Sequence, residues 1–292
     1  MAAVVVSGVP GWPNGAMFPI LNLGGPIRVS SQPAAVEEKK KPDRRSDLSF
    51  LSPFIYPTHL VDPRQSKTDR VVVLDLDETL VHSFHLEAEL NAINRYNIWA
   101  SSNHPELRLI VKKLNIDNPG PPGEGTRIKV YMVYRPGLKR FLSRLTYWAS
   151  AIIVLTAGKA SYAFKAYQQI WSDLPKPRAL LTADVCDKEI IEVPGYPRQL
   201  RLFKRLEKVY GMYPEARPDN TILIDNADYN TKPNPKNSIL IPDYQPDPTI
   251  ESILTPDDCL NKIMDFFEAP GSEVAHGDVR KVDLTQIFGN GN

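Results

Sequence analysis

Two aspartates one residue apart follow a short apolar run near residue 70. Residues 70–80 read Arg-Val-Val-Val-Leu-Asp-Leu-Asp-Glu-Thr-Leu, and the three valines and the leucine predict a short buried strand. Asp75 and Asp77 point the same way if the backbone stays extended, and a loop there lets Asp77 swing toward a shared ligand. Either arrangement brings two negative charges together and favours a bound cation. The alternative is an acidic strand end that caps a helix, which leaves Thr79 unexplained.

The same stretch resembles a phosphatase motif. Asp-Leu-Asp-Glu-Thr-Leu-Val-His, residues 75–82, resembles the first motif of the haloacid dehalogenase superfamily. It is most similar to the branch that dephosphorylates the carboxy-terminal domain of RNA polymerase II. The resemblance extends over roughly Arg70 to Phe267, through Arg-Pro-Gly at 135–137, Leu-Thr-Ala-Gly at 155–158 and the Asp-Asn pair at 225–226. It implies a protein serine/threonine phosphatase that uses Mg²⁺ and an aspartyl-phosphate intermediate.

The resemblance assigns catalytic roles to the first motif and to Thr156. Phosphoryl transfer through an aspartate needs a carboxylate nucleophile, a proton donor, a divalent cation and donors for the phosphoryl oxygens. Asp75 is the expected nucleophile, ionised at pH 7 without help. Asp77 is the expected acid and then base, because a neighbouring carboxylate should raise its pKa. Thr156 and Thr79 are expected to bind the substrate, Thr156 by donating a hydrogen bond to a phosphoryl oxygen.

The expected Mg²⁺ ligands are all oxygens, which this cation prefers. They are Asp75, the backbone carbonyl of Asp77 and, by the resemblance, Asn226. Asp225 lies beside Asn226 in the sequence, as a further ligand or as support for one.

The third family motif has two candidates. The family places a lysine shortly before the fourth core strand, often as Lys-Asp-Leu or Lys-Pro-Leu. The stretch matched to it is Tyr-Pro-Arg-Gln-Leu at residues 196–200, which places Arg198 at the lysine position. Lys204 lies further along the same predicted helix, and we expect Arg198 rather than Lys204 to contact the phosphate. Arginine binds phosphate with a fork of donors, whereas lysine supplies a compact charge.

Strand and helix patterns alternate through this region and predict an α/β fold with a doubly wound, mostly parallel sheet. Besides the first, the expected core strands are Ala151–Leu155, Arg178–Thr182, Thr221–Ile224 and Ser238–Ile241. Strands at Leu107–Leu114 and Arg127–Tyr134 predict an inserted β-hairpin. Expected helices include Leu86–Tyr96, one opening at residues 135–137, one from Gly158 to about Trp171, Arg198–Tyr210 and Asp257–Glu268. Ligands of such sheets bind beyond the carboxyl ends of the strands.

The domain limits follow from composition. We expect a disordered or irregular extension at residues 1–68, a phosphatase domain at 69–270 with its insertion at about 84–130, and a tail at 271–292. The charged run at residues 37–45 is either a solvated linker or a weak nuclear-import signal. We expect a nuclear or cytoplasmic protein in preference to a mitochondrial one.

Charge and hydropathy exclude several classes of function. The chain has 292 residues and a net charge of +1, so no strong field favours direct binding to nucleic acid. No run of 18 apolar residues predicts a membrane span. Cys186 and Cys259 form no metal-binding spacing or disulfide framework, and we interpret Cys186 as structural.

The expected partner is a phosphorylated protein, with the RNA polymerase II tail as a candidate. Two alternatives stay open: a scaffold of the same fold that has lost activity, and a small-molecule phosphatase of the wider superfamily.

Overall fold

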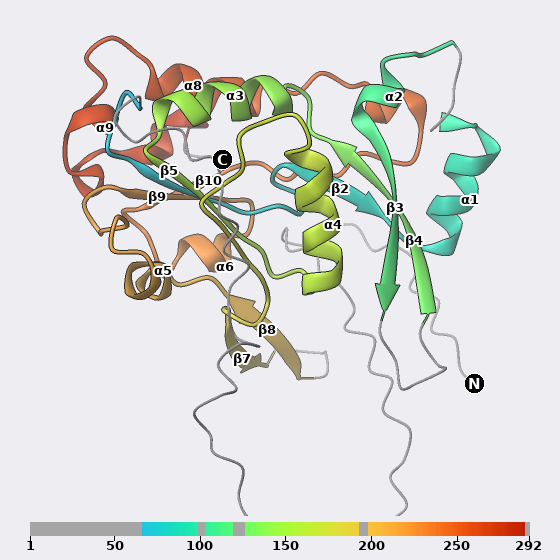
Figure 1. Ribbon diagram of the computed structural model, residues 1–292, viewed down its shortest axis with the longest axis horizontal. Helices are drawn as coiled ribbons and strands as arrows, with labels where there is room; N and C mark the ends of the chain where they lie inside the picture. Colours follow the sequence, from blue (N-terminus) through green and yellow to red (C-terminus); the bar gives the residue numbers. More distant parts are fainter. Residues whose placement is uncertain (1–65, 99–102, 119–125, 193–197, 290–292) are drawn as a thin grey trace, which may run out of the picture. The chain divides into compact units, whose positions relative to one another are not determined.

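The central sheet is built from five parallel strands. The computed structural model describes residues 66–98, 103–118, 126–192 and 198–289, all within one compact unit, Phe54–Asn292. Within these residues the strand order is β10-β9-β1-β5-β6 (Figure 1). The strands are β1 (Val71–Leu74), β5 (Ala151–Leu155), β6 (Ala179–Leu181), β9 (Thr221–Asp225) and β10 (Ser238–Leu240). The predicted core strands and the parallel α/β architecture are confirmed.

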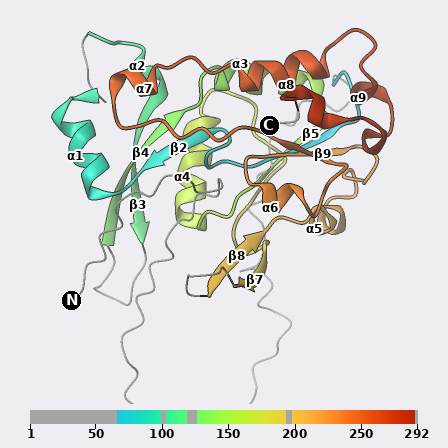
Figure 2. The same ribbon diagram turned by 180° about the vertical axis from the view of Figure 1, so that it is seen from behind.

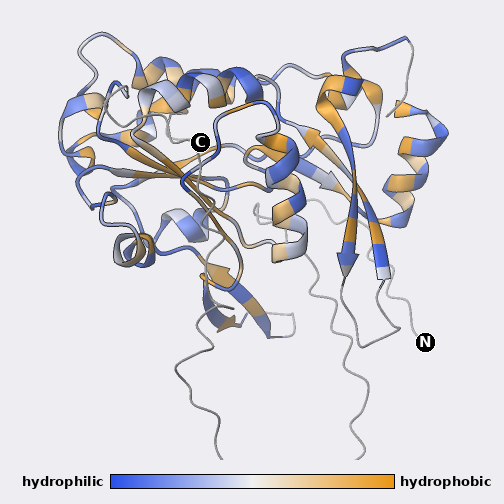
Figure 3. Cartoon of the chain, viewed as in Figure 1, coloured by the Kyte–Doolittle hydropathy of each residue, from blue (hydrophilic) through white to orange (hydrophobic). Residues whose placement is uncertain are grey.

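Strand β1 is at the centre of the sheet and is buried on both faces. Its side chains alternate between two apolar clusters, with Val72 and Leu74 in one and Val71 and Val73 in the other. A strand covered on both faces needs the continuous apolar run seen in the sequence. Figure 3 shows hydrophobic colouring concentrated on these central strands.

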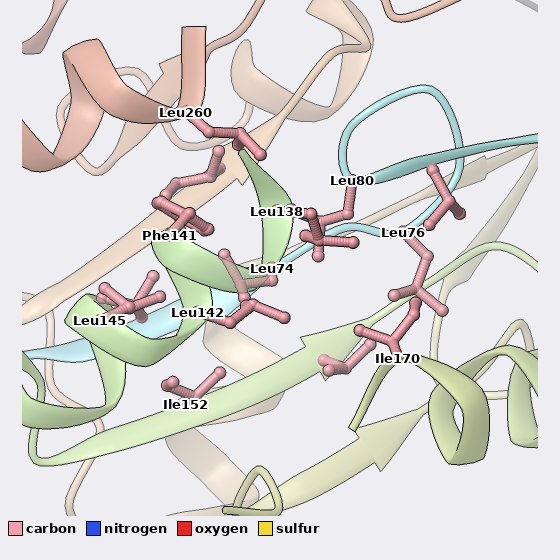
Figure 4. Packing of buried hydrophobic residues seen from close by; sticks show 14 of the residues in the cluster. Leu74, Leu76, Leu80, Leu138, Phe141, Leu142, Leu145, Ile152, Ile170 and Leu260 are labelled. Atoms are coloured by element: carbon pink, nitrogen blue, oxygen red, sulfur yellow. The ribbon is translucent and has the colours of Figure 1, made fainter. Parts of the chain in front are cut away.

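Helices cover both faces of the sheet, as a doubly wound fold requires. One face packs against α3 (Leu138–Trp148), α4 (Ala160–Ile170) and α8 (Cys259–Phe267). The other packs against α5 (Leu206–Met212), through Leu206 and Val209. Figure 4 shows Leu138, Phe141 and Leu142 of α3 against Leu74. The predicted apolar face of α3 is therefore the one that is buried.

The insertion after β1 is a three-stranded antiparallel sheet of order β2-β4-β3. Its elements are β2 (Val81–Phe84), α1 (Glu87–Arg95), α2 (Leu107–Ile110), β3 (Val111–Asn118) and β4 (Thr126–Tyr134). The β3–β4 hairpin is confirmed, but residues 107–110 form a helical turn and β2 supplies a strand that the sequence analysis missed. Helix α7 (Ile250–Ile253) adds Ile253 to the apolar cluster of this insertion.

The predicted helix at Arg198–Tyr210 is wrong. Residues 199–203 form strand β8 (Gln199–Phe203), which pairs antiparallel with β7 (Asp187–Ile191), and α5 begins only at Leu206. Leu200 and Leu202 alternate with Gln199, Arg201 and Phe203, and this period of two favours a strand once a partner strand is available. The change of element moves Arg198 and Lys204 to opposite ends of β8.

The chain beyond residue 270, expected as a tail, packs on the domain. It forms α9 (Glu273–His276), η4 (Val279–Lys281) and η5 (Leu284–Ile287), and Val274, Val279 and Leu284 join the main apolar cluster (Figure 2). Buried Arg70 donates hydrogen bonds to the carbonyl oxygens of Val274 and Gly277.

The predicted import signal and nearly all of the N-terminal extension lie outside the described residues. Across the described part of the chain, no helix has both the length and the apolar character that a membrane crossing requires.

Candidate active site

The loop between β1 and β2 is a tight turn that places both aspartates. Asp75 donates its backbone N–H to Ile224 of β9, and Val81 donates to Leu76, which closes the turn. Glu78 has a φ of 61°, a left-handed conformation that is uncommon for a side chain other than glycine. Its carboxylate lies 2.8 Å from Nδ1 of His82, so this pair supports the turn.

Asp75 and Asp225 share the ammonium group of Lys204. Nζ of Lys204 lies 2.5 Å from Oδ1 of Asp75 and 2.7 Å from Oδ2 of Asp225, and all three side chains are at most 5% exposed. Asn230 of α6 (Asp228–Thr231) donates to both oxygens of Asp225, and its own Oδ1 accepts from the backbone N–H of Lys204. Lys204 is thus fixed against Asp75 by side chains of two other elements.

Asp77 lies in a second network that includes a tyrosine the sequence analysis did not select. The hydroxyl of Tyr162, on α4, donates to Oδ1 of Asp77 at 2.5 Å, and Oγ of Ser83 lies 2.8 Å from the tyrosine oxygen. Thr156 Oγ1 lies 3.3 Å from Oδ2 of Asp77 and accepts from the backbone N–H of Gly158. Oδ2 is therefore the more weakly engaged carboxylate oxygen of Asp77.

Glycine at position 158 keeps space beside these groups. A Cβ there would lie 3.2 Å from Oγ1 of Thr156, 3.2 Å from Cδ1 of Tyr162 and 3.5 Å from Oδ2 of Asp77. The Leu-Thr-Ala-Gly stretch therefore brings Thr156 to Asp77, and its glycine leaves room next to Oδ2 of Asp77.

Thr79 and Asn226 join the ends of β1 and β9. Oγ1 of Thr79 lies 3.0 Å from both Oδ2 of Asp75 and Oδ1 of Asn226, and it accepts the backbone N–H of Asn226. Asn226 donates its amide to Asp243, which leaves Oδ1 toward Thr79. Thr79 is fully buried and its hydroxyl contacts both Asp75 and Asn226, so its binding of a substrate stays a prediction.

Burial controls the charges of both aspartates of the first motif. Burial, reinforced by the negative charges of Asp225 and Asp77, raises the pKa of Asp75, and Lys204 acts against this rise. Asp75 is therefore harder to ionise than expected, and the ammonium of Lys204 favours its charged form. Burial also raises the pKa of Asp77, so the predicted direction is right, although desolvation is the main cause and not the neighbouring carboxylate.

The charges of Lys204 and Tyr162 follow from the same surroundings. Burial acts to lower the pKa of Lys204, but Asp225 and Asp75 raise it above its ordinary value, so Lys204 stays an ammonium. Burial and the charge of Asp77 raise the pKa of Tyr162, so its hydroxyl keeps the proton that it donates to Asp77.

The oxygen donors of this site fit a divalent cation. Asp75, Asp77 and Asp225 are buried beside one ammonium, which leaves negative charge that a divalent cation would offset. The donors available are Asp75, the carbonyl of Asp77 and Oδ1 of Asn226. Asp225 is occupied by Lys204, Asn230 and the N–H of Ala227, so it supports the site and is not a free ligand. Across the described residues, no group of three or more His, Cys, Asp or Glu side chains is arranged to hold a metal ion, so the donor set depends on the carbonyl of Asp77 and on Asn226.

The preference for Arg198 over Lys204 is wrong. The Arg198 side chain is 75% exposed and pairs with Glu192, whereas Lys204 is buried against Asp75. The sequence contained a signal that the chosen register missed: Lys-Arg-Leu at 204–206 has the spacing of the family's Lys-Asp-Leu. The exchange of helix for strand at residues 199–203 is what separates the two cations.

Arg135, of the Arg-Pro-Gly stretch, supports the first-motif turn from behind. Its fully buried guanidinium pairs with Asp257 at 2.8 Å and donates to the backbone oxygen of Thr79. The arginine therefore ties the turn that holds Asp75 and Asp77 to the start of α8.

Neither cysteine of the described chain is prepared for nucleophilic chemistry. Burial raises the pKa of Cys186 to about 11, and burial also raises the pKa of Cys259. Both remain thiols at neutral pH, which agrees with the structural interpretation of Cys186.

Comparison with known proteins places the chain in a family. Nuclear envelope morphology protein 1 of Saccharomyces cerevisiae is 24% identical over 205 residues, which are 69% of this chain and 41% of the yeast protein. A solved structure of the RNA polymerase II CTD phosphatase Fcp1 is 20% identical, with a TM-score of 0.44, over 62% of this chain and 44% of its own. Fission yeast Fcp1 with beryllium fluoride is 24% identical, also with a TM-score of 0.44, over 62% and 43%.

These coverages mean that the chain spans less than half the length of each of these relatives. The family model for NLI interacting factor-like phosphatases matches residues 70–280, from the start of β1 through η4. The match includes the turn with Asp75 and Asp77, Lys204 and the Asp225-Asn226 pair. The chain belongs to the NLI interacting factor-like phosphatase family.

Proposed function

We propose that the chain is a Mg²⁺-dependent phosphoprotein phosphatase that acts on phosphoserine or phosphothreonine through a phosphorylated Asp75. One observation carries the proposal: Lys204 lies within hydrogen-bond distance of Asp75, while Asp77 is held separately by Tyr162. A nucleophile, a fixed cation and a proton donor thus lie at one edge of the sheet.

In the first step, a carboxylate oxygen of Asp75 attacks phosphorus while the bond from phosphorus to the substrate oxygen breaks. Asp77 transfers the proton on Oδ2 to that leaving oxygen. In the second step, Asp77 accepts a proton from water, and the water oxygen attacks phosphorus. The bond to Asp75 breaks, inorganic phosphate leaves, and both aspartates return to their first state.

Three donors would hold Mg²⁺: a carboxylate oxygen of Asp75, the carbonyl of Asp77 and Oδ1 of Asn226. When bound, the cation would draw electron density from the phosphoryl oxygens and neutralise charge as the bonds change. Lys204 supplies positive charge from the side of Asp225. Thr156 can exchange its long contact with Asp77 for a hydrogen bond to a phosphoryl oxygen.

A protein substrate is supported by the size of the insertions. Between the strands that form the site, the described residues insert a three-stranded sheet and a two-stranded hairpin. Neither has the size of a domain that encloses a small metabolite, so an exposed segment of a phosphoprotein is the better substrate. The RNA polymerase II tail stays a candidate within this class, and a nuclear or cytoplasmic location stays a prediction.

Position 204 bears on the scaffold alternative. An arginine in place of the third-motif lysine would suggest that activity has been lost. Because Lys204 lies at Asp75, the site has its lysine, and this argument for a scaffold no longer applies. A small-molecule phosphatase uses the same chemistry and differs only in substrate.

The test measures Mg²⁺-dependent hydrolysis of an aryl phosphate, of phosphoserine and phosphothreonine peptides, and of sugar phosphates, with Asp75→Asn as the control. We expect activity that Asp75→Asn abolishes without loss of fold, and peptides hydrolysed better than sugar phosphates. Full turnover by a folded Asp75→Asn protein would refute the mechanism. A preference for sugar phosphates would support the small-molecule alternative, and an inactive parent protein would support the scaffold.

A further inference from the structure

Arg201, near the proposed site, stacks on an aromatic ring, whereas Arg198 and Arg205 pair with carboxylates. Arg201 lies on β8, and its guanidinium carbon is 4.6 Å from the centre of the Tyr229 ring. Phe203 packs edge-on against the same ring, with centroids 5.7 Å apart. Arg201 and Phe203 are two residues apart on a strand, so both side chains lie on one face of the hairpin. Tyr229 is the platform for both.

The two arginines nearest to Arg201 in the chain are paired. Arg198 pairs with Glu192, and Arg205 pairs with Asp187 and Glu189. Glu189 lies opposite Arg201 in the register of the hairpin, yet its carboxylate is held by Arg205 at 2.7 Å.

Within the part of the chain that the structure describes, Arg201 therefore has no carboxylate in ion-pair range, and no acceptor takes a hydrogen bond from it. Stacking occupies the flat face of a guanidinium and leaves the N–H groups at its edge available. That edge matches the paired oxygens of a phosphate or carboxylate. Arg201 is half-buried and held by the ring, so less side-chain entropy is lost when it binds an anion.

Tyr229 connects Arg201 to the catalytic groups. It belongs to α6, and the next residue, Asn230, bonds to both Asp225 and the backbone of Lys204. Phe203, which contacts the ring, directly precedes Lys204 in the chain. Three residues of extended chain span roughly 10 Å, so the Cα of Arg201 lies within about that distance of the Cα of Lys204.

We infer that Arg201, stacked on Tyr229, is an accessory anion-binding subsite that selects substrates with a second anionic side chain near the phosphorylated residue. This inference rests on the proposed function and adds a substrate class to it. The two side chains add to this Cα separation, so the two anions are expected a few residues apart in an extended peptide. The preferred substrate is therefore a phosphoprotein segment with a second phosphate, or an aspartate or glutamate, within a few residues of the scissile phosphate.

The test compares full-length wild type with Arg201→Ala, Arg201→Lys, Tyr229→Leu and the matched control Arg198→Ala, which lies on the same hairpin but is exposed and paired. The substrates are one phosphoserine peptide with neutral neighbours, peptides with aspartate at one to three residues on either side, and peptides with a second phosphoserine at those positions. The measured quantity is the ratio of kcat/KM between each anionic peptide and the neutral one. Phosphonate analogues of the same peptides give the corresponding ratio of Kd without turnover.

For wild type we expect the best anionic peptide to be preferred, and for Arg201→Ala we expect that ratio to fall about tenfold, equivalent to ~1.4 kcal/mol. Arg201→Lys should retain part of the ratio, because it keeps charge but loses the fork and the stacking. Tyr229→Leu should reduce the ratio, and Arg198→Ala should keep it. The peptide set identifies whether phosphate or carboxylate is the preferred second anion.

An unchanged ratio in Arg201→Ala would overturn the inference, and so would equal losses on neutral and anionic peptides, which indicate a structural role. If the ratio falls equally in Arg198→Ala, the preference comes from positive surface charge in general, and the inference is also overturned. Failure of the proposed function has a different result: no variant or parent turns over any peptide. In that case the Kd ratios still decide whether Arg201 selects a second anion.

Discussion

The ammonium nitrogen of Lys204 lies 2.5 Å from Oδ1 of Asp75, although the two residues are 129 positions apart in the chain. The contact gives the buried carboxylate of Asp75, the proposed nucleophile, a counter-charge. It also limits where positive charge can come from, because Arg198 is turned to solvent and paired with Glu192.

We predict that Lys204→Ala lowers turnover by about one hundredfold or more, since it removes a charge that contacts the transition state. Arg198→Ala is the matched control and should keep turnover close to wild type. Initial rates with an aryl phosphate measure both. Circular dichroism checks the fold of the Lys204 variant, because the change leaves two buried carboxylates without their counter-charge. A crippled Arg198→Ala beside an active Lys204→Ala would reverse the assignment.

We predict that Tyr162→Phe impairs proton donation by Asp77. Without the hydroxyl, Oδ1 of Asp77 loses its short hydrogen bond, and Oδ2 is no longer directed at the leaving oxygen. Poor leaving groups depend most on a proton donor. Hydrolysis of an alkyl phosphate should therefore fall about tenfold more than hydrolysis of p-nitrophenyl phosphate.

Tyr134→Phe provides the control for this prediction, because the hydroxyl of Tyr134 donates to the carbonyl of Gln169 and the residue belongs to the main apolar cluster. It should leave the ratio of the two rates unchanged. If Tyr162→Phe lowers both rates equally, Tyr162 serves packing and does not orient the acid.

We predict that Asn226→Ala raises the Mg²⁺ concentration needed for half-maximal rate by at least about tenfold. Changes to residues around metal ligands already have effects of this size. Chelation should silence the wild-type protein, and added Mg²⁺ should restore it. A titration of rate against Mg²⁺ measures both effects. Activity that survives exhaustive chelation, or an unchanged midpoint in Asn226→Ala, would contradict the proposed ligand set.

We predict that the pair between Arg135 and Asp257 makes the fold sensitive to acid. Burial acts to raise the pKa of Asp257, but the hydrogen bonds and charge of Arg135 hold it below its ordinary value. A depressed folded pKa contributes stability above the unfolded pKa of about 3.9, and this stability is lost as pH falls through the folded value. Denaturant unfolding between pH 7 and pH 3 measures the loss.

Asp257→Asn separates this pair from the other carboxylates. The variant should lose about 2 kcal/mol at pH 7, because Arg135 is fully buried, and its stability should fall less steeply below about pH 4. Asp258→Asn is the control, since Asp258 is exposed and pairs with Lys262 on the surface, where such pairs contribute about 0–1 kcal/mol. Parallel pH curves for Asp257→Asn and wild type would show that the pair does not govern acid sensitivity.

Local pattern was sufficient to predict the architecture and the first motif. The apolar run before Asp75 predicts a buried strand, which the structure shows covered on both faces, and the alternation of such runs with amphipathic helices predicts a parallel α/β sheet. Because the carboxyl ends of parallel strands share one edge, the sequence already indicated that Asp75, Thr156 and Asn226 meet.

Tertiary structure decided which distant groups complete the site. Residues 199–203 have a pattern compatible with either helix or strand, and pairing with β7 settles it, which sends Arg198 to solvent and Lys204 to Asp75. Tyr162 reaches Asp77 only because α4 packs beside the first-motif turn, a contact that no spacing in the chain encodes. Burial is the main cause that raises the pKa of Asp75 and of Asp77, and desolvation depends on everything that surrounds a group in space.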